Sequence, residues 1–160
     1  MDLWIRGGAA LLALGFEGRV TADIDVLPGS RFVESDLQRA CESAGLLWNP
    51  QDKDAPAGDY VEVVPAASLV LPTAMTDYDP VYRGRMLTVR TPPAADLVIG
   101  KLKRLDPEDM ADIQYLIVRH SVDVAALREA FGRLPDRWQR DSVLTDNLRY
   151  VIDDLWGEKS

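Results

Sequence analysis

Hydrophobic and polar positions at the start of the chain predict a strand followed by a helix. Residues 2–5 (DLWI) favour a short strand, and the glycine pair Gly7-Gly8 ends it. The apolar run 9–14 (AALLAL) then predicts a short helix, which we expect to end at Gly15. The chain therefore opens with a strand, a glycine turn and a helix.

Strict alternation over residues 20–27 predicts a second strand with two different faces. Val20, Ala22, Ile24 and Val26 form the face expected to enter the core. Thr21, Asp23, Asp25 and Leu27 form the opposite face, which is mostly polar. A buried strand has no use for two aspartates in its folding, so this segment calls for a chemical explanation.

Further elements follow at a spacing typical of an α+β domain. Residues 32–45 predict a helix, residues 49–59 a polar loop, and residues 60–64 and 86–89 two strands. The positions expected on the apolar side of the helix are Leu37, Ala40, Cys41 and Ala44.

After Pro92-Pro93 the apolar spacing becomes helical. It predicts a helix from Ala94 to Leu105 and a second one to Ile117, which Asp106 caps with Pro107 at its first position. Two more helices are expected at 123–131 and 140–155. We predict a mixed β-sheet flanked by helices with a C-terminal helical portion, divided into a domain at 1–120 and a helical extension at 121–160.

Composition narrows the classes of function. The chain has 160 residues, a formal net charge of −8 and one cysteine, Cys41, so an internal disulfide is excluded and non-specific affinity for nucleic acid is not expected. No long apolar run predicts a membrane segment or a secretory signal, and we expect a cytoplasmic protein.

Asp23 and Asp25 have the spacing of a metal-binding pair. Side chains two residues apart on a strand share a face and lie about 6.5–7 Å apart along it. Both carboxylates can therefore point to the same place in front of the sheet and share a cation. Magnesium takes few carboxylates and fills its remaining positions with water and phosphate oxygens. The alternative is an edge strand whose polar face is simply solvated.

The glycine pair is a second feature that favours a binding site. Gly7 and Gly8 stand between a predicted strand and a predicted helix, where glycines let the backbone approach a ligand and free N–H groups can bind phosphate. An ordinary tight turn is the alternative for the pair by itself. Together with the aspartates it favours a nucleotide site.

These stretches resemble a known family. The segment RGGAALLALGFEGRVTADIDVL looks like the opening of the minimal nucleotidyltransferase superfamily, and DLVIGKLKRLDPEDMADIQYLI resembles the lysine and aspartate helix pair of its toxin-like branch. That branch includes abortive-infection nucleotidyltransferase toxins and related uncharacterised bacterial proteins. The resemblance spans about residues 3–117 and is loose in the middle.

The resemblance implies a divalent cation (Mg²⁺ or Mn²⁺), a nucleoside triphosphate, and an acceptor hydroxyl on RNA, such as transfer RNA, or on a protein. It also implies a cognate antitoxin as a partner. The implied metal ligands are Asp23, Asp25 and Glu62. The implied nucleotide-binding residues are Gly7, Gly8, Thr21 and Lys101. The implied catalytic residues are Asp23, Asp25, Lys101 and Asp112.

Physical chemistry supports these implied roles unevenly. Lys101 lies one turn from Leu97 and Leu105, so its ammonium is expected to emerge at a cleft edge, although an ordinary surface lysine has the same pattern. Asp109 is in the first turn of a helix, where interaction with the helix dipole explains it. Asp112 lies one turn further on, where the helix end explains it less well.

Two departures from the family pattern stand out. Relatives carry a helix before the glycine pair, and here only a short strand precedes it, which indicates a trimmed or mis-started chain. Asp77 and Asp79 compete with Glu62 as the third carboxylate, but Pro80 makes a solvated loop the favoured interpretation of that pair.

Two reactive residue types receive no role. His120 is expected at a helix end, and Cys41 as a small core residue.

The leading hypothesis is a metal-dependent nucleotidyltransferase. A catalytically degenerate member that binds a nucleotide or partner is the alternative, and an acidic interaction protein is a third.

Overall fold

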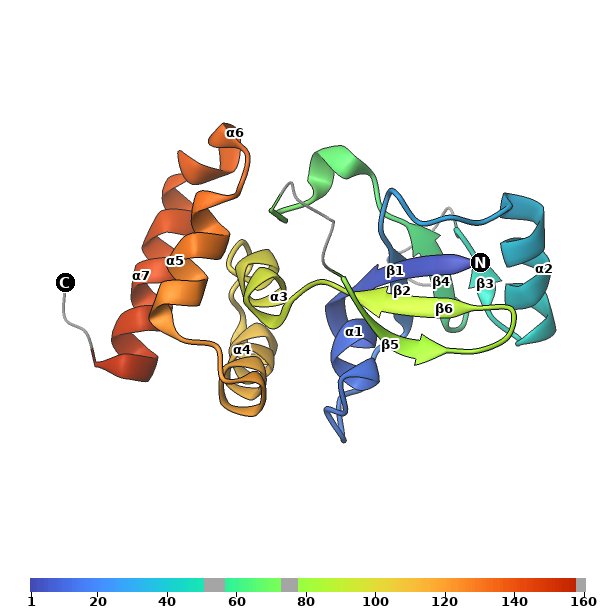
Figure 1. The fold of residues 1–160 in the computed structure, drawn as a ribbon, viewed down its shortest axis with the longest axis horizontal. Coiled ribbons are helices and arrows are strands. Elements are labelled where there is room, and N and C mark those ends of the chain that lie inside the picture. The colour runs from blue at the N-terminus through green and yellow to red at the C-terminus, as the bar shows by residue number, and fades with distance from the viewer. Residues whose placement is uncertain (51–56, 73–77, 158–160) are drawn as a thin grey trace. The chain divides into compact units, whose positions relative to one another are not determined.

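The computed structural model describes residues 1–50, 57–72 and 78–157, and these divide into two compact units (Figure 1). The first unit comprises Met1–Leu69 and Tyr78–Pro92, and the second comprises Val70–Asp77 and Pro93–Ser160. The helix pair after Pro93 thus groups with the C-terminal helices. The boundary at residue 120 proposed from the sequence stays a prediction.

A mixed β-sheet forms the first unit. Over the described residues it has six strands in the order β3-β4-β2-β1-β6-β5, with β1 antiparallel to β2 and parallel to β6, while β2 and β4 are parallel (Figure 1). The strands are β1 (Asp2–Arg6), β2 (Asp23–Val26), β3 (Leu47–Trp48), β4 (Tyr60–Val63), β5 (Asp79–Arg83) and β6 (Thr88–Thr91). The predicted α+β fold with a mixed sheet and C-terminal helices is confirmed.

One face of the sheet is apolar and packs against α2 (Glu34–Ser43). Leu3, Val26 and Val61 from three strands meet Leu37 and Cys41 from the helix, and burial of these side chains stabilises the unit. Leu37 and Cys41 are buried as expected. Ala40 is exposed but lines an apolar pocket on this side of the sheet, as expected of the apolar side of the helix, whereas Ala44 is exposed.

The strand predicted at 20–27 is shorter than its alternation suggested. Strand β2 begins at Asp23, where its pairing with Tyr60 of β4 begins, and Val20 and Ala22 are exposed before it. The expectation that these two residues enter the core is therefore wrong. The alternation of residues along one strand does not show where its pairing with a neighbouring strand begins.

Other boundaries differ where the sequence signal was weak. The first helix, α1 (Gly7–Ala13), begins at the glycine pair, with no separate turn between it and β1. Strands β3 and β5 and the 3-10 helix η1 (Ala66–Ser68) were not predicted. Asp79 lies in β5, whereas Asp77 lies outside the described residues.

The second unit is helical. Its helices are α3 (Ala94–Lys101), α4 (Pro107–His120), α5 (Val124–Gly132), α6 (Asp136–Gln139) and α7 (Ser142–Trp156). Three of them begin at aspartates, Asp106, Asp123 and Asp141, whose side chains accept hydrogen bonds from backbone N–H groups of the first turn. The cap predicted at Asp106 is confirmed, and no helix of the described residues is long and apolar enough to cross a membrane.

A tight joint connects α3 and α4. Leu105 adopts a left-handed backbone conformation with φ of 49°, and Asp106 then accepts a hydrogen bond from the Asp109 N–H at 2.8 Å. This geometry reverses the chain between the two helices over a few residues, so that side chains at the end of α3 meet those of the first turns of α4.

Candidate active site

A row of charged residues crosses the face of the sheet opposite to α2. Strand pairing sets Arg6 of β1 beside Asp25 of β2, and Asp25 beside Glu62 of β4. Since side chains alternate along a strand, the neighbours Ile5, Val26 and Val61 point to the apolar face. The two faces of one sheet therefore separate the core from the charged row.

Asp23 and Asp25 share this polar face, as the sequence predicted. Burial raises the pKa of Asp25, the Arg6 guanidinium lowers it, and the negative charges of Asp23 and Glu62 raise it again, with a net upward shift. The carboxylates thus influence one another electrostatically in a place where water screens them poorly. An added cation would relieve both the desolvation and the mutual repulsion.

Arg6 occupies part of this site. Its Nε donates to Asp25 Oδ2 at 3.1 Å, and the side chains of the two residues are 25% and 15% exposed. Arg6 was not singled out from the sequence because the pairing of β1 with β2 cannot be read from either strand alone. Its place directly before Gly7-Gly8 was the only available signal.

The glycine pair lies against the aspartate strand. Gly7 has a φ of 65°, and a Cβ atom at this residue would lie 3.4 Å from Asp25 Oδ2. A Cβ atom at Gly8 would lie only 2.7 Å from Thr21 Oγ1, so any larger residue would force Thr21 to move. Thr21 in turn donates a hydrogen bond to Asp23 Oδ1. The structure therefore brings Gly7, Gly8, Thr21, Asp23 and Asp25 together.

The donor set of this group fits a magnesium ion that also binds phosphate. Asp23, Asp25 and Glu62 offer the carboxylate oxygens that hard cations prefer. Within the described residues, no group of three or more His, Cys, Asp or Glu side chains is arranged to hold a metal ion. Magnesium bound through one or two carboxylates, with water and phosphate completing its shell, does not need such a group. The metal and the role of Glu62 stay predictions.

The lysine and aspartate helices form a separate charged cluster in the second unit. Lys101 Nζ lies 2.6 Å from Asp112 Oδ2 and 3.1 Å from Asp109 Oδ1. Arg104 donates to both oxygens of Asp109, at 2.9 and 3.0 Å. The side chains of Asp112 and Asp109 are 1% and 3% exposed, and that of Lys101 is 10% exposed. The predicted pair Lys101 and Asp112 is thus in direct contact.

This cluster differs from its predicted arrangement in two respects. The Lys101 ammonium is bound to two carboxylates and its side chain is mostly buried, whereas we expected the ammonium to emerge at a cleft edge. Asp109, which the helix dipole seemed to explain, is a buried ion-pair partner. Burial by itself would raise the pKa of Asp109, but the hydrogen bonds and charges of Arg104 and Lys101 outweigh this and lower it.

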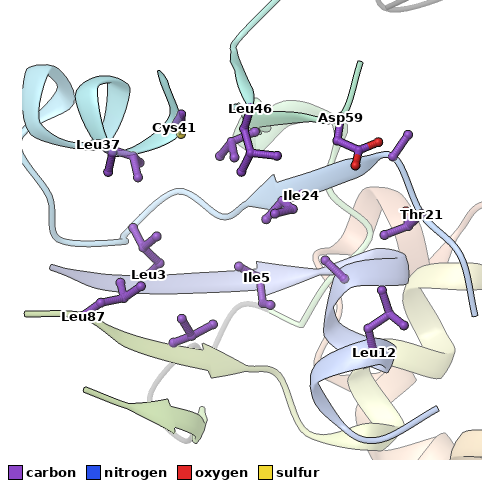
Figure 2. A pocket seen from close by; sticks show the side chains of 15 residues that line it. Leu3, Ile5, Leu12, Thr21, Ile24, Leu37, Cys41, Leu46, Asp59 and Leu87 are labelled. Atoms are coloured by element: carbon purple, nitrogen blue, oxygen red, sulfur yellow. The ribbon is translucent and has the colours of Figure 1, made fainter. Parts of the chain in front are cut away.

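An apolar pocket of about 420 Å³ lies on the α2 side of the sheet. Figure 2 shows side chains of β1, β2 and α2 around it, with Thr21 and Asp59 at the end opposite Leu37. The carboxylates of Asp23 and Asp25 belong to the other face of the sheet, so the pocket is not the site of the charged row. Thr21 is the residue that borders both features.

His120 and Cys41 take the unreactive places expected of them. His120 is the last residue of α4 and is exposed, and Cys41 is buried against the sheet, where burial raises the pKa of its thiol.

Comparison with known proteins gives one informative match. No curated protein and no solved structure matches the chain significantly. A family model described as a nucleotidyltransferase of unknown function matches residues 1–138, which include the charged row, the glycine pair and the lysine and aspartate helices. The chain therefore belongs to this nucleotidyltransferase family of unknown function (DUF6036).

Proposed function

We propose that this protein is a metal-dependent nucleotidyltransferase that moves a nucleoside monophosphate from a nucleoside triphosphate to a hydroxyl group of RNA or protein. One observation carries the proposal. Asp23 and Asp25 lie on one face of β2, with the Gly7 backbone close enough that a Cβ atom there would contact Asp25. This supports a cation site at the aspartates beside a glycine backbone that could bind phosphate.

The residues of the first unit divide the work as follows. Asp23 and Asp25, with Glu62 as a third ligand, would hold Mg²⁺ or Mn²⁺, which supplies charge neutralisation at the reacting phosphate. The Gly7-Gly8 backbone would cradle the triphosphate, and Thr21 keeps Asp23 oriented through its hydroxyl. The acceptor oxygen forms a bond to the α-phosphorus, the bond between the α-phosphorus and the bridging oxygen breaks, and pyrophosphate leaves. The hydroxyl proton passes to water or to a carboxylate of the row.

Lys101 and Asp112 enter the proposal through the family resemblance. Lys101 would neutralise phosphate charge, and Asp112 would hold the lysine in place through the 2.6 Å contact between Nζ and Oδ2. Because Lys101 is already paired with two carboxylates, contact with phosphate requires it to exchange or share a partner. Asp112 is therefore a positioning residue in this proposal.

The acceptor and the biological role are the finer part of the proposal. A net charge of −8 disfavours general affinity for polyanions, so an RNA acceptor such as transfer RNA would be held by local contacts. A role as the toxin of a cytoplasmic toxin-antitoxin pair, with a cognate antitoxin, follows from the resemblance to the toxin-like branch.

Label transfer tests the activity directly. The protein is incubated with each labelled nucleoside triphosphate, Mg²⁺, and total cellular RNA or protein. Asp23→Asn/Asp25→Asn should abolish transfer, whereas Asp36→Asn, which removes an exposed carboxylate of α2, should not. Transfer that persists in the double variant would contradict the assignment. Metal-dependent triphosphate binding with no transfer to any acceptor would instead support a degenerate, binding-only member, which the pairing of Arg6 with Asp25 favours as the second candidate.

A further inference from the structure

We propose that Arg6 couples metal binding to triphosphate binding by exchanging Asp25 for a phosphate group. The inference rests on the proposed function and adds a residue and an order of events to it. Without ligands, Arg6 balances the charge of Asp25. Once a divalent cation takes Asp25, the guanidinium becomes a phosphate-binding group beside the glycine pair.

Competition for one carboxylate is the first step of the argument. Arg6 Nε lies 3.1 Å from Asp25 Oδ2, and a Cβ atom at Gly7 would lie 3.4 Å from the same oxygen. A cation bound through this oxygen must displace the guanidinium, because two positive groups at the same acceptor repel each other. Metal binding to the free protein therefore includes the loss of a charge-assisted hydrogen bond.

The displaced guanidinium needs a new anionic partner. The side chain of Arg6 is 25% exposed, so its charge is only partly hydrated when it leaves Asp25. Arg6 is the last residue of β1 and immediately precedes Gly7, whose lack of a side chain lets the backbone lie close to the Asp25 carboxylate. An arginine fork matches phosphate geometry with two parallel N–H bonds, so a triphosphate at the glycine pair is the partner of matching chemistry.

Coupling of the two ligands follows. Triphosphate draws Arg6 away from Asp25 and so improves the metal site, and by reciprocity the metal improves the triphosphate site to the same extent. Hydrogen bonds to charged groups contribute enough that loss of this pair should change metal affinity by about tenfold or more.

Arg6→Gln tests the proposal, with Arg39→Gln as the matched control. Arg39 lies on α2 of the same unit and forms an exposed ion pair with Asp36. Its replacement therefore removes the same charge without removing a partner of Asp25. Titration calorimetry would measure the affinity for Mn²⁺ alone, and then for ATP, GTP, CTP and UTP with and without Mn²⁺. Arg6→Gln should bind Mn²⁺ about tenfold more tightly than the parent and bind triphosphate with Mn²⁺ about tenfold more weakly. The mutual enhancement of the two ligands should be reduced, since only direct coordination of Mn²⁺ by the triphosphate would remain. Arg39→Gln should match the parent.

Two outcomes would overturn the proposal. One is unchanged or weaker Mn²⁺ affinity in Arg6→Gln, and the other is undiminished enhancement of triphosphate binding by Mn²⁺ in that variant. Arg6→Lys keeps the positive charge and should retain the weak Mn²⁺ binding of the parent. This variant is a second test of the competition between residue 6 and Mn²⁺ for Asp25. If parent protein transfers label but Arg6→Gln behaves like the parent, the inference fails and the function stands. If no triphosphate binds to the parent, the function fails, while the Mn²⁺ titration still tests the competition with Arg6.

Discussion

Replacing Lys101 with methionine should strongly destabilise the helical unit. The substitution keeps an unbranched chain of similar length and removes the ammonium. Lys101 Nζ contacts Asp112 Oδ2 at 2.6 Å and Asp109 Oδ1 at 3.1 Å, and both carboxylates are almost completely buried. Asp109 keeps its two hydrogen bonds to Arg104, so most of the damage falls on Asp112.

The magnitude follows from the burial of Asp112. Removing one partner of a buried ion pair leaves a desolvated charge and costs about 3–5 kcal/mol. Because Arg104 still neutralises Asp109, we expect the lower end of this range, about 3 kcal/mol. Adding Asp112→Asn to Lys101→Met removes the buried charge that the ammonium had balanced and should recover about 2 kcal/mol.

Urea denaturation at neutral pH measures these differences as changes in the free energy of unfolding, provided the slope with urea stays constant. Lys103→Met is the control, because Lys103 lies two residues away with a side chain 51% exposed and should shift the midpoint far less. A loss below about 1 kcal/mol for Lys101→Met, or no recovery in the double variant, would refute this account of the cluster. The double variant also separates stability from activity, since a stable protein without label transfer would show a need for the Lys101 and Asp112 pair beyond folding.

Three further predictions concern single residues. Gly8→Ala should cost about 1–3 kcal/mol by urea denaturation because its Cβ atom would lie 2.7 Å from Thr21 Oγ1, whereas Gly58→Ala, with nothing within 4 Å, should be nearly neutral. The pKa of Asp109 is lowered in the folded protein, so this residue adds stability above its unfolded pKa, and the stability is lost as pH falls through the folded pKa. Urea unfolding of Asp109→Asn at a series of pH values should lack this acid-dependent loss. A pH profile of stability parallel to that of the parent would contradict the prediction. Cys41 has a pKa raised by burial, so iodoacetamide should label it slowly at neutral pH in the native protein and readily in urea, and equal rates would contradict its buried place.

Much of the fold was predictable because local signals and tertiary structure agree. Apolar spacing located α3, α4, α5 and α7 of the second unit, whereas the short helix α6 was missed, and the aspartate before Pro107 marked the start of α4. Strand ends were less predictable, since β2 begins where its partner β4 begins and not where the alternation begins. Strand β5 was missed because Asp79 and Pro80 favour a turn locally, while pairing with β6 holds them in a strand.

The candidate site was also predictable only in part. Spacing along one strand was enough to put Asp23 and Asp25 on a common face, and the glycine pair is near them as expected. The neighbours across the sheet required the register of three strands, which no local pattern encodes. Arg6 was overlooked for this reason, although it touches the carboxylate that the sequence marked most clearly.

Lys101 shows how a correct choice of residues can accompany a wrong picture of their environment. Its spacing from Leu97 and Leu105 is that of a lysine with a solvated head, and a pattern along one helix contains no information about what the next helix brings. The left-handed residue Leu105 and the cap at Asp106 turn the chain so that the first turns of α4 present Asp109 and Asp112 to Lys101. The charge proposed to meet phosphate is thus already balanced in the folded chain. In the proposed mechanism, a nucleotide phosphate would have to compete with Asp109 and Asp112 for the Lys101 ammonium or share it with them, so the strength of these two ion pairs would limit what Lys101 contributes to nucleotide binding.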